Sequence, residues 1–189
     1  MKDIIENEFS EHIKTANLLY NLTDAIANAS QLCIDCLKNG GKILLFGNGG
    51  SAADAQHIAA EFIGRFKLER KSFPAIALTT DTSIITALSN DYSNDIIFSR
   101  QCESLVSNGD IIIGISTSGN SKNVQNGLIT SKQKGAITIG LLGNDGGIIK
   151  NYVDIQIIIK SSSTAKIQEA HRVIYHIICE LVELEMSKN

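Results

Sequence analysis

The sequence predicts an α/β fold, a doubly wound, Rossmann-like sheet of five parallel strands flanked by helices. Five isoleucine-rich runs alternate along the chain with amphipathic stretches. Runs that are apolar at nearly every position, rather than at every second one, are typical of strands buried on both faces of a parallel sheet. The runs cover residues 42–46, 75–80, 110–116, 136–143 and 154–160.

Helical patterns precede and follow these strands. Apolar residues recur at helical spacing through residues 1–40, which predicts two helices, and Gly40 and Gly41 close the second one. The last segment is predicted to form one long helix with a Ser/Thr cap near Ser163 or Thr164. Its apolar positions exceed a single stripe, so we expect this helix to be buried against a partner chain.

The length of 189 residues and the absence of a proline-rich linker predict one domain. In this prediction residues 1–189 form a single unit, in which helices over 1–40 extend an α/β core over 41–189. A formal charge of −3 disfavours nucleic-acid binding. No apolar segment near the N-terminus resembles a signal peptide or a membrane span, so we expect a cytoplasmic protein without a membrane partner.

The cysteines include one C-x-x-C pair, Cys33 and Cys36, inside the second helical pattern. A structural zinc site needs a second such pair, and a redox site needs a strand directly before the motif. We therefore expect these thiols to pack inside a helix interface.

A glycine-rich loop follows the first predicted strand. Gly47, Gly49 and Gly50 allow backbone N–H groups to approach an anion or a sugar closely. The loop lacks the G-K-[ST] ending of a P-loop, and its G-x-G-x-x-A pattern lacks the acidic residue that holds a ribose, so no nucleotide cofactor is expected. A plain strand-to-helix turn is the alternative.

A hydroxyl-rich loop follows the third predicted strand, with Ser116, Thr117, Ser118 and Ser121 around Gly119. Hydroxyls and free N–H groups at a helix N-terminus can hold a phosphate group without lysine or arginine. The carboxyl end of a parallel strand is where such folds bind ligands. A helix cap within a solvated turn is the alternative interpretation.

His57 and Glu61 stand four residues apart, which places both on one face of the helix after the glycine-rich loop. Such a pair suits a metal site or acid/base work, although a surface contact is the alternative. The terminal helix adds Gln168, His171 and His176, of which we expect His171 to be a packed core or interface residue. The basic residues 65, 67, 70 and 71 either steer an anionic substrate or are simply solvated.

In this order, the segments resemble the bacterial phosphoheptose isomerases of the sugar-isomerase (SIS) superfamily over nearly the whole chain: GNGGSAADAQHIAAEF, TTDTSIITALSNDYS, STSGNS and STAKIQEAHRVIYH. The resemblance implies the SIS fold with an N-terminal helical extension. It implies an enzyme that converts sedoheptulose 7-phosphate to D-glycero-D-manno-heptose 7-phosphate through an enediol, for lipopolysaccharide or capsule. It also implies a cytoplasmic homotetramer with active sites at subunit interfaces and one zinc ion per subunit.

Carried over to matching positions, the family's functional residues fall on three sets. The implied substrate contacts are Asn48, Gly49, Gly50, Ser51, Glu61, Asn90, Asp91, Ser116, Thr117, Ser118, Ser121 and Gln168. The implied zinc ligands are His57, Glu61, Gln168 and His176, and the implied catalytic pair is Glu61 and His176. We expect Glu61 to act as the base at carbon and His176 as the acid at oxygen, with the opposite assignment left open. For Asn90 and Asp91 the sequence alone predicts only a turn after a helix.

The spacing of Gln168 and His176 makes it difficult for both side chains to bind the same metal ion within one chain. Gln168 and His176 lie about 12 Å apart along a helix axis at 1.5 Å per residue. They reach one ion only by leaning together or from different subunits, so we expect a site shared between chains.

Two other functions remain as alternatives. One is a non-enzymatic SIS protein that binds a protein partner, of the DnaA-initiator-associating type, and the other is an isomerase for pentose or hexose phosphates. The complete set of implied metal ligands favours the heptose isomerase, because a pure binding protein has no need of them.

Overall fold

The computed structural model describes residues 1–188 and confirms the five-stranded parallel sheet. The strands lie in the order β2-β1-β3-β4-β5. Their largely apolar sequences suit a sheet that is covered on both faces. The strands are β1 (Ile43–Gly47), β2 (Ala75–Ala77), β3 (Ile111–Ser116), β4 (Ile137–Gly143) and β5 (Ile155–Ile159).

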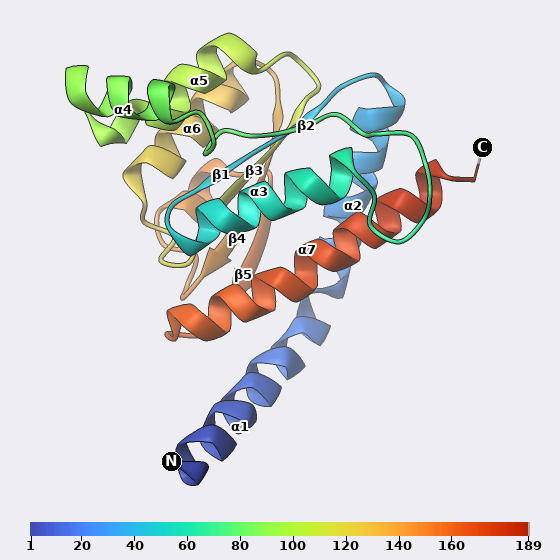
Figure 1. Cartoon of the computed structure of the whole chain (residues 1–189), viewed down its shortest axis with the longest axis vertical. Coiled ribbons are helices and arrows are strands. Elements are labelled where there is room, and N and C mark those ends of the chain that lie inside the picture. The colour runs from blue at the N-terminus through green and yellow to red at the C-terminus, as the bar shows by residue number, and fades with distance from the viewer. Residues whose placement is uncertain (189) are drawn as a thin grey trace.

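Helices cover both faces of the sheet (Figure 1). One face packs against α2 (Thr23–Lys38), α3 (Gly50–Ile63) and α7 (Thr164–Met186). The other face packs against α4 (Thr82–Asp91), α5 (Ile97–Leu105) and α6 (Lys122–Gln133). Short 3₁₀ helices lie at η1 (Leu19–Leu22), η2 (Asn94–Ile96) and η3 (Ile149–Tyr152).

The N-terminal residues form the expected helices, α1 (Lys2–Leu18) and α2. Gly40, just past α2, has a φ of +79°, a conformation that glycine adopts without strain. Cys33 and Cys36 are buried on α2, which confirms that these thiols pack in a helix interface. Helix α1 points away from the body of the molecule (Figure 1).

Helix α7 begins as predicted, because the Ser163 hydroxyl accepts a hydrogen bond from the Lys166 N–H at 3.5 Å. Among the described residues, no helix is long and apolar enough to cross a membrane.

Four of the strands agree with their predicted bounds within one residue, and two other places differ further. The strand expected over 75–80 ends at Ala77, because the Thr80 hydroxyl donates to the Ala77 carbonyl at 3.2 Å and closes a turn. Asn90 and Asp91 do not follow a helix but form its last two residues, since α4 extends to Asp91. The helix starts at Asp81, whose carboxylate accepts from the Ile84 N–H at 2.9 Å.

Candidate active site

The glycine-rich loop and the hydroxyl-rich loop are neighbours at the carboxyl edge of the sheet. β1 and β3 pair side by side up to Gly47 and Ile115. The chain leaves β1 into α3 on one face of the sheet and leaves β3 into α6 on the other face. The two loops therefore meet at the topological switch point of the sheet, which is where open α/β sheets bind their ligands.

A pair of amides joins the two loops. Asn48 and Asn123 each donate an amide N–H to the side-chain oxygen of the other, both at 2.9 Å. Gly49 caps α3 with a φ of +55°, and a Cβ on Gly50 would lie 2.4 Å from Gln168 Nε2. The glycines thus allow a close approach to the α3 N-terminus, whereas Ser51 is buried beneath the loop.

The hydroxyls of the second loop face one another. Ser116 Oγ lies 3.0 Å from Ser121 Oγ and 3.4 Å from Ser118 Oγ. Ser121 is the first residue before α6, but its side chain makes no capping hydrogen bond. The cap interpretation is therefore wrong for the Ser121 side chain. The hydroxyls instead cluster at a helix N-terminus, where an anion is favoured.

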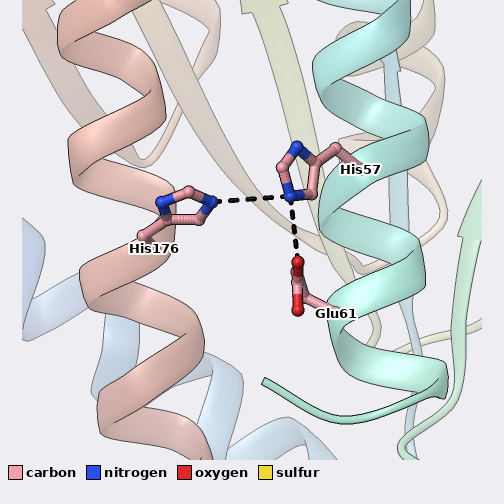
Figure 2. Close-up of side chains that lie close together, drawn as sticks. All are labelled: His57, Glu61 and His176. Carbon is pink, nitrogen blue, oxygen red and sulfur yellow. Dashed lines mark hydrogen bonds and ion pairs between the residues drawn. The ribbon is translucent and has the colours of Figure 1, made fainter. Parts of the chain in front are cut away.

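His57, Glu61 and His176 come together on two adjacent helices (Figure 2). α3 supplies the first two residues and α7 supplies the third. His57 Nε2 lies 2.9 Å from Glu61 Oε1 and 3.5 Å from His176 Nε2. One ligand atom from each residue lies within 4.8 Å of the others, and all three side chains are half-buried.

The surroundings of His176 favour its neutral form. Burial lowers the pKa of His176 below its ordinary value, and the nearby His57 lowers it further, against an opposing effect of Glu61. The rings of Phe66 and Tyr175 pack against the imidazole, with centroids at 5.4 Å and 4.9 Å. A neutral imidazole keeps a lone pair that can accept a proton or bind a metal.

The donor set of these three residues fits a divalent metal such as zinc. Two imidazole nitrogens and one carboxylate oxygen are a ligand set that catalytic zinc sites use, with a further position left for water or substrate. Without a cation or a shared proton, the close approach of His57 Nε2 to a carboxylate oxygen would bring two lone pairs together.

Gln168 is not part of this group within one chain. Helices α3 and α7 run side by side, so that Gln168 faces Gly50 near the start of α3 while His176 faces His57. The sequence spacing of about 12 Å along α7 is therefore preserved. The structure brings together three of the four predicted metal ligands.

Asn90 and Asp91 lie exposed at the end of α4, where the Asn90 amide donates to Asp91 Oδ1 at 2.8 Å. Within residues 1–188, neither side chain makes a hydrogen bond to the two loops or to the His57 cluster. Their assignment as substrate contacts stays a prediction.

Asp54 and Tyr175 are two buried residues outside the predicted site that lie next to the His57 cluster. Asp54 is 3% exposed and Tyr175 is 1% exposed, and the Tyr175 hydroxyl lies 3.3 Å from His57 Nδ1. The position of Asp54, one helical turn before His57, is a sequence signal that could have identified it. Tyr175 carries no such signal, because an aromatic residue on an apolar helix is consistent with simple packing.

His171 is a core residue, as predicted. It is fully buried, its Nε2 donates to the Leu142 carbonyl at 3.1 Å, and burial lowers its pKa to about 4. Its Nδ1 has no hydrogen-bond partner among the described residues, so only one of the two ring nitrogens is hydrogen-bonded.

Arg70 lies in the basic segment, for which we expected either steering of an anionic substrate or plain solvation, and it fits neither. The Arg70 side chain is 5% exposed and pairs with the buried carboxylate of Glu183 at 3.2 Å. It is therefore neither solvated nor free to steer a substrate.

Comparisons with known proteins agree with this architecture. A family model described as the SIS domain matches residues 10–143. The chain is 57% identical to a phosphoheptose isomerase of Geobacter sulfurreducens over 162 residues, 86% of each chain. It is 54% identical to one of Nitratiruptor sp. over 97% of this chain and 98% of that protein.

A solved structure of phosphoheptose isomerase GmhA from Neisseria gonorrhoeae superposes with a TM-score of 0.92. The two sequences are 40% identical, over 97% of this chain and 98% of that one. Identity at this level over nearly the full length shows the family, and the chain belongs to the phosphoheptose isomerases of the SIS superfamily.

Proposed function

We propose that this enzyme isomerises sedoheptulose 7-phosphate to D-glycero-D-manno-heptose 7-phosphate, in the biosynthesis of heptose for lipopolysaccharide or capsule. The observation that carries the proposal is the cluster of His57, Glu61 and His176 on α3 and α7, of which α3 begins directly after the glycine-rich loop. Its relatives at 57% and 54% identity carry the name phosphoheptose isomerase.

The phosphate group of the substrate binds at the hydroxyl-rich loop in this proposal. Ser116, Thr117, Ser118 and Ser121 supply hydroxyls beside the α6 N-terminus, whose free N–H groups favour an anion. The sugar chain extends toward the glycine-rich loop, because the amide pair of Asn48 and Asn123 holds the two loops side by side. The remaining sugar contacts follow from the family: Asn48, Gly49, Gly50, Ser51, Glu61, Asn90, Asp91 and Gln168.

The chemistry moves a carbonyl group from C2 to C1 of the open-chain sugar. Glu61 takes a proton from C1, which gives a cis-enediol, and returns a proton to C2. His176 moves protons between the two oxygens, a task that suits an imidazole held neutral by its surroundings. The roles of Glu61 and His176 can also be exchanged, and both assignments use the same pair.

Zinc is the cofactor in this proposal, one ion per subunit. His57, Glu61 and His176 would hold it, and Gln168 would complete the set by leaning toward them or from another subunit. When bound, zinc polarises the oxygens of the carbonyl and hydroxyl groups and stabilises negative charge on them. Glu61 has two carboxylate oxygens, so one can bind the ion while the other handles the proton.

We propose further that the enzyme is a homotetramer with active sites at subunit interfaces. Exposed apolar side chains on α1 and α7 support this assembly, together with a cavity of about 440 Å³ between α7 and the segment from the end of α1 through η1 to the start of α2. The exposed residues are Ile4, Ile5, Phe9 and Ile13 on α1 and Val173, Ile177, Leu181 and Leu184 on α7. An apolar surface of this kind marks an interaction site. A cytoplasmic location stays a prediction.

The non-enzymatic alternative is not favoured, because the relatives that match at high identity carry the name of an enzyme and because His57, Glu61 and His176 lie together. Isomerases for shorter sugar phosphates share the two loops, so substrate choice needs a direct test.

A substrate panel tests the proposal. Purified enzyme with zinc is assayed on sedoheptulose 7-phosphate and, at equal concentration, on ketopentose and ketohexose phosphates. We expect the highest kcat/KM for the heptose, and loss of turnover after treatment with a chelator that zinc reverses. Preference for a shorter sugar phosphate, or no turnover of any substrate with zinc supplied, would contradict the proposal.

A further inference from the structure

The ring of His57 has a second nitrogen, Nδ1, that points away from the metal cluster. It lies 3.3 Å from the hydroxyl of Tyr175, which is 1% exposed. The two rings meet edge to face with centroids 5.5 Å apart. Metal-bound histidines generally donate the hydrogen of their second nitrogen to a fixed acceptor, which sets the ring orientation and the tautomer.

The hydrogen bonds around Tyr175 determine which group donates. The hydroxyl donates its single hydrogen to Asp54 Oδ1 at 3.2 Å, and it accepts a hydrogen bond from Arg172 Nε at 2.9 Å. A hydroxyl oxygen has one hydrogen and two lone pairs. With the hydrogen and one lone pair engaged, only a lone pair remains for His57, so Nδ1 must be the donor.

The neighbours of the hydroxyl keep it in this orientation. Asp54 is 3% exposed and accepts a second hydrogen bond from Arg172 Nη2 at 3.2 Å. Burial raises the pKa of Tyr175 above its ordinary value, and the charge of Asp54 adds to that effect, so the phenol keeps its hydrogen. A carboxylate accepts only and a guanidinium donates only, so neither partner can reverse its role.

We propose that Tyr175 is a positioning residue that fixes His57 as the tautomer with hydrogen on Nδ1. Nε2 then remains for the metal ion, which would take the place of the hydrogen that the contact with Glu61 Oε1 at 2.9 Å requires in the metal-free protein. This inference rests on the proposed metal site, because the tautomer is the one that the metal-loaded protein would hold.

The first test is nitrogen NMR on zinc-loaded protein labelled with ¹⁵N-histidine. In the wild type we expect zinc on Nε2 of His57 and, on Nδ1, a hydrogen that exchanges slowly with water. In Tyr175→Phe we expect this hydrogen to exchange faster, because its acceptor is gone. A hydrogen on Nε2 in the wild type, or equally slow exchange in both proteins, overturns the inference.

The second test is zinc affinity, measured by competition with a chelator. Tyr175→Phe keeps the buried ring and removes only the hydroxyl, and we expect its Kd for zinc to rise about 10–100-fold. Tyr152→Phe is the matched control, because it removes the hydroxyl of a half-buried tyrosine on η3, in the layer on the opposite face of the sheet. Its Kd for zinc should equal that of the wild type.

The outcomes separate this inference from the proposed function. Equal zinc affinity in wild type and Tyr175→Phe, with only a lower melting temperature, would show a purely structural role and overturn the inference. A wild type that binds no zinc would contradict the proposed metal site and the inference with it, whereas zinc bound equally well by both proteins would contradict the inference alone.

Discussion

Arg70 and Glu183 form an ion pair that is almost completely removed from solvent, with side chains 5% and 2% exposed. The Glu183 carboxylate also accepts hydrogen bonds from the backbone N–H groups of Phe66, Lys67 and Leu68, at 2.7 to 2.8 Å. The Arg70 guanidinium in turn donates to the Glu61 and Phe62 carbonyls, both at 2.7 Å. The pair therefore ties the loop after α3 to the end of α7 and holds the catalytic helix in place.

Glu183→Gln should destabilise the protein by about 3–5 kcal/mol, because it leaves the Arg70 charge buried without its partner. Urea denaturation measures the change in the free energy of unfolding. Glu180→Gln is the matched control on the same helix, since Glu180 pairs with Lys67 at the surface and such pairs contribute about 0–1 kcal/mol. Equal effects of the two variants would show that the buried pair has no special role.

The same carboxylate should make stability sensitive to acid. Burial raises the pKa of Glu183, but the backbone N–H groups of residues 66–68 together with Arg70 lower it below the ordinary 4.5. A group whose pKa is depressed in the folded state stabilises the fold above its unfolded pKa, and this contribution is lost as the pH falls through the folded value.

We therefore expect the free energy of unfolding of the wild type to fall below a pH of about 4.5, and more steeply than that of Glu183→Gln. A series of urea denaturations from neutral to acidic pH measures both slopes. Parallel slopes would assign the acid sensitivity to other carboxylates.

The sequence could not predict this ion pair. Arg70 stands in a segment where four basic residues suit solvent equally well, and Glu183 lies 113 positions later on another element. Only the packing of α7 beside the loop removes both from water. His57, Glu61 and His176 could be predicted, because the helical spacing and the family motifs place them directly.

Among the secondary-structure elements, the strands and helices could be predicted from the local sequence where burial is uniform along the element. Every residue of the central strands β1 and β3 is buried, and α7 begins at the predicted serine. The prediction failed at the edge strand β2, which has one strand neighbour and ends where Thr80 closes a turn. The direction in which Gln168 points could not be predicted, because it depends on how α3 and α7 lie side by side.

The amide pair between the loops makes a prediction about substrate binding. Asn123→Ala removes two hydrogen bonds to Asn48 of about 0.5–1.5 kcal/mol each, so the glycine-rich loop loses its fixed position. We expect KM for the sugar phosphate to rise about 10-fold or more, with a smaller change in kcat. Steady-state kinetics measure both parameters.

Asn126→Ala is the control on the same helix, because the Asn126 amide donates to the Asp95 carbonyl, away from the loops. Its KM should stay within about twofold of the wild-type value. If Asn123→Ala left KM unchanged, the amide pair would not be needed to keep the glycine-rich loop in its binding position.

In the molecule as a whole, α1 is the helix whose apolar side chains are left most exposed by the rest of the chain. It points away from the body and carries Phe9 and Ile13 at 66% and 60% exposure (Figure 1). An isolated helix of 17 residues is only marginally stable in water. Contact with another copy of the chain would bury this face, in agreement with the proposed tetramer.

Replacing both Phe9 and Ile13 by Glu should break this assembly, because charge on a buried apolar face is strongly unfavourable. Light scattering coupled to size exclusion measures the mass. We expect a tetramer for the wild type and smaller species for the double variant. Asn7→Glu, which adds a charge near the opposite side of α1, should remain a tetramer, and a double variant of unchanged mass would exclude α1 from the interface.

In the proposed mechanism, Glu61 and His176 isomerise a heptose phosphate by proton transfer through an enediol. An NMR time course of sedoheptulose 7-phosphate with the zinc-loaded enzyme in D₂O, beside Glu61→Gln and His176→Ala, tests this mechanism. We expect aldoheptose 7-phosphate with deuterium at C2 for the wild type, and a rate lower by about 10²–10⁴-fold in each variant. Aldose formed at the wild-type rate by both variants, or no aldose from the wild type, would contradict the mechanism.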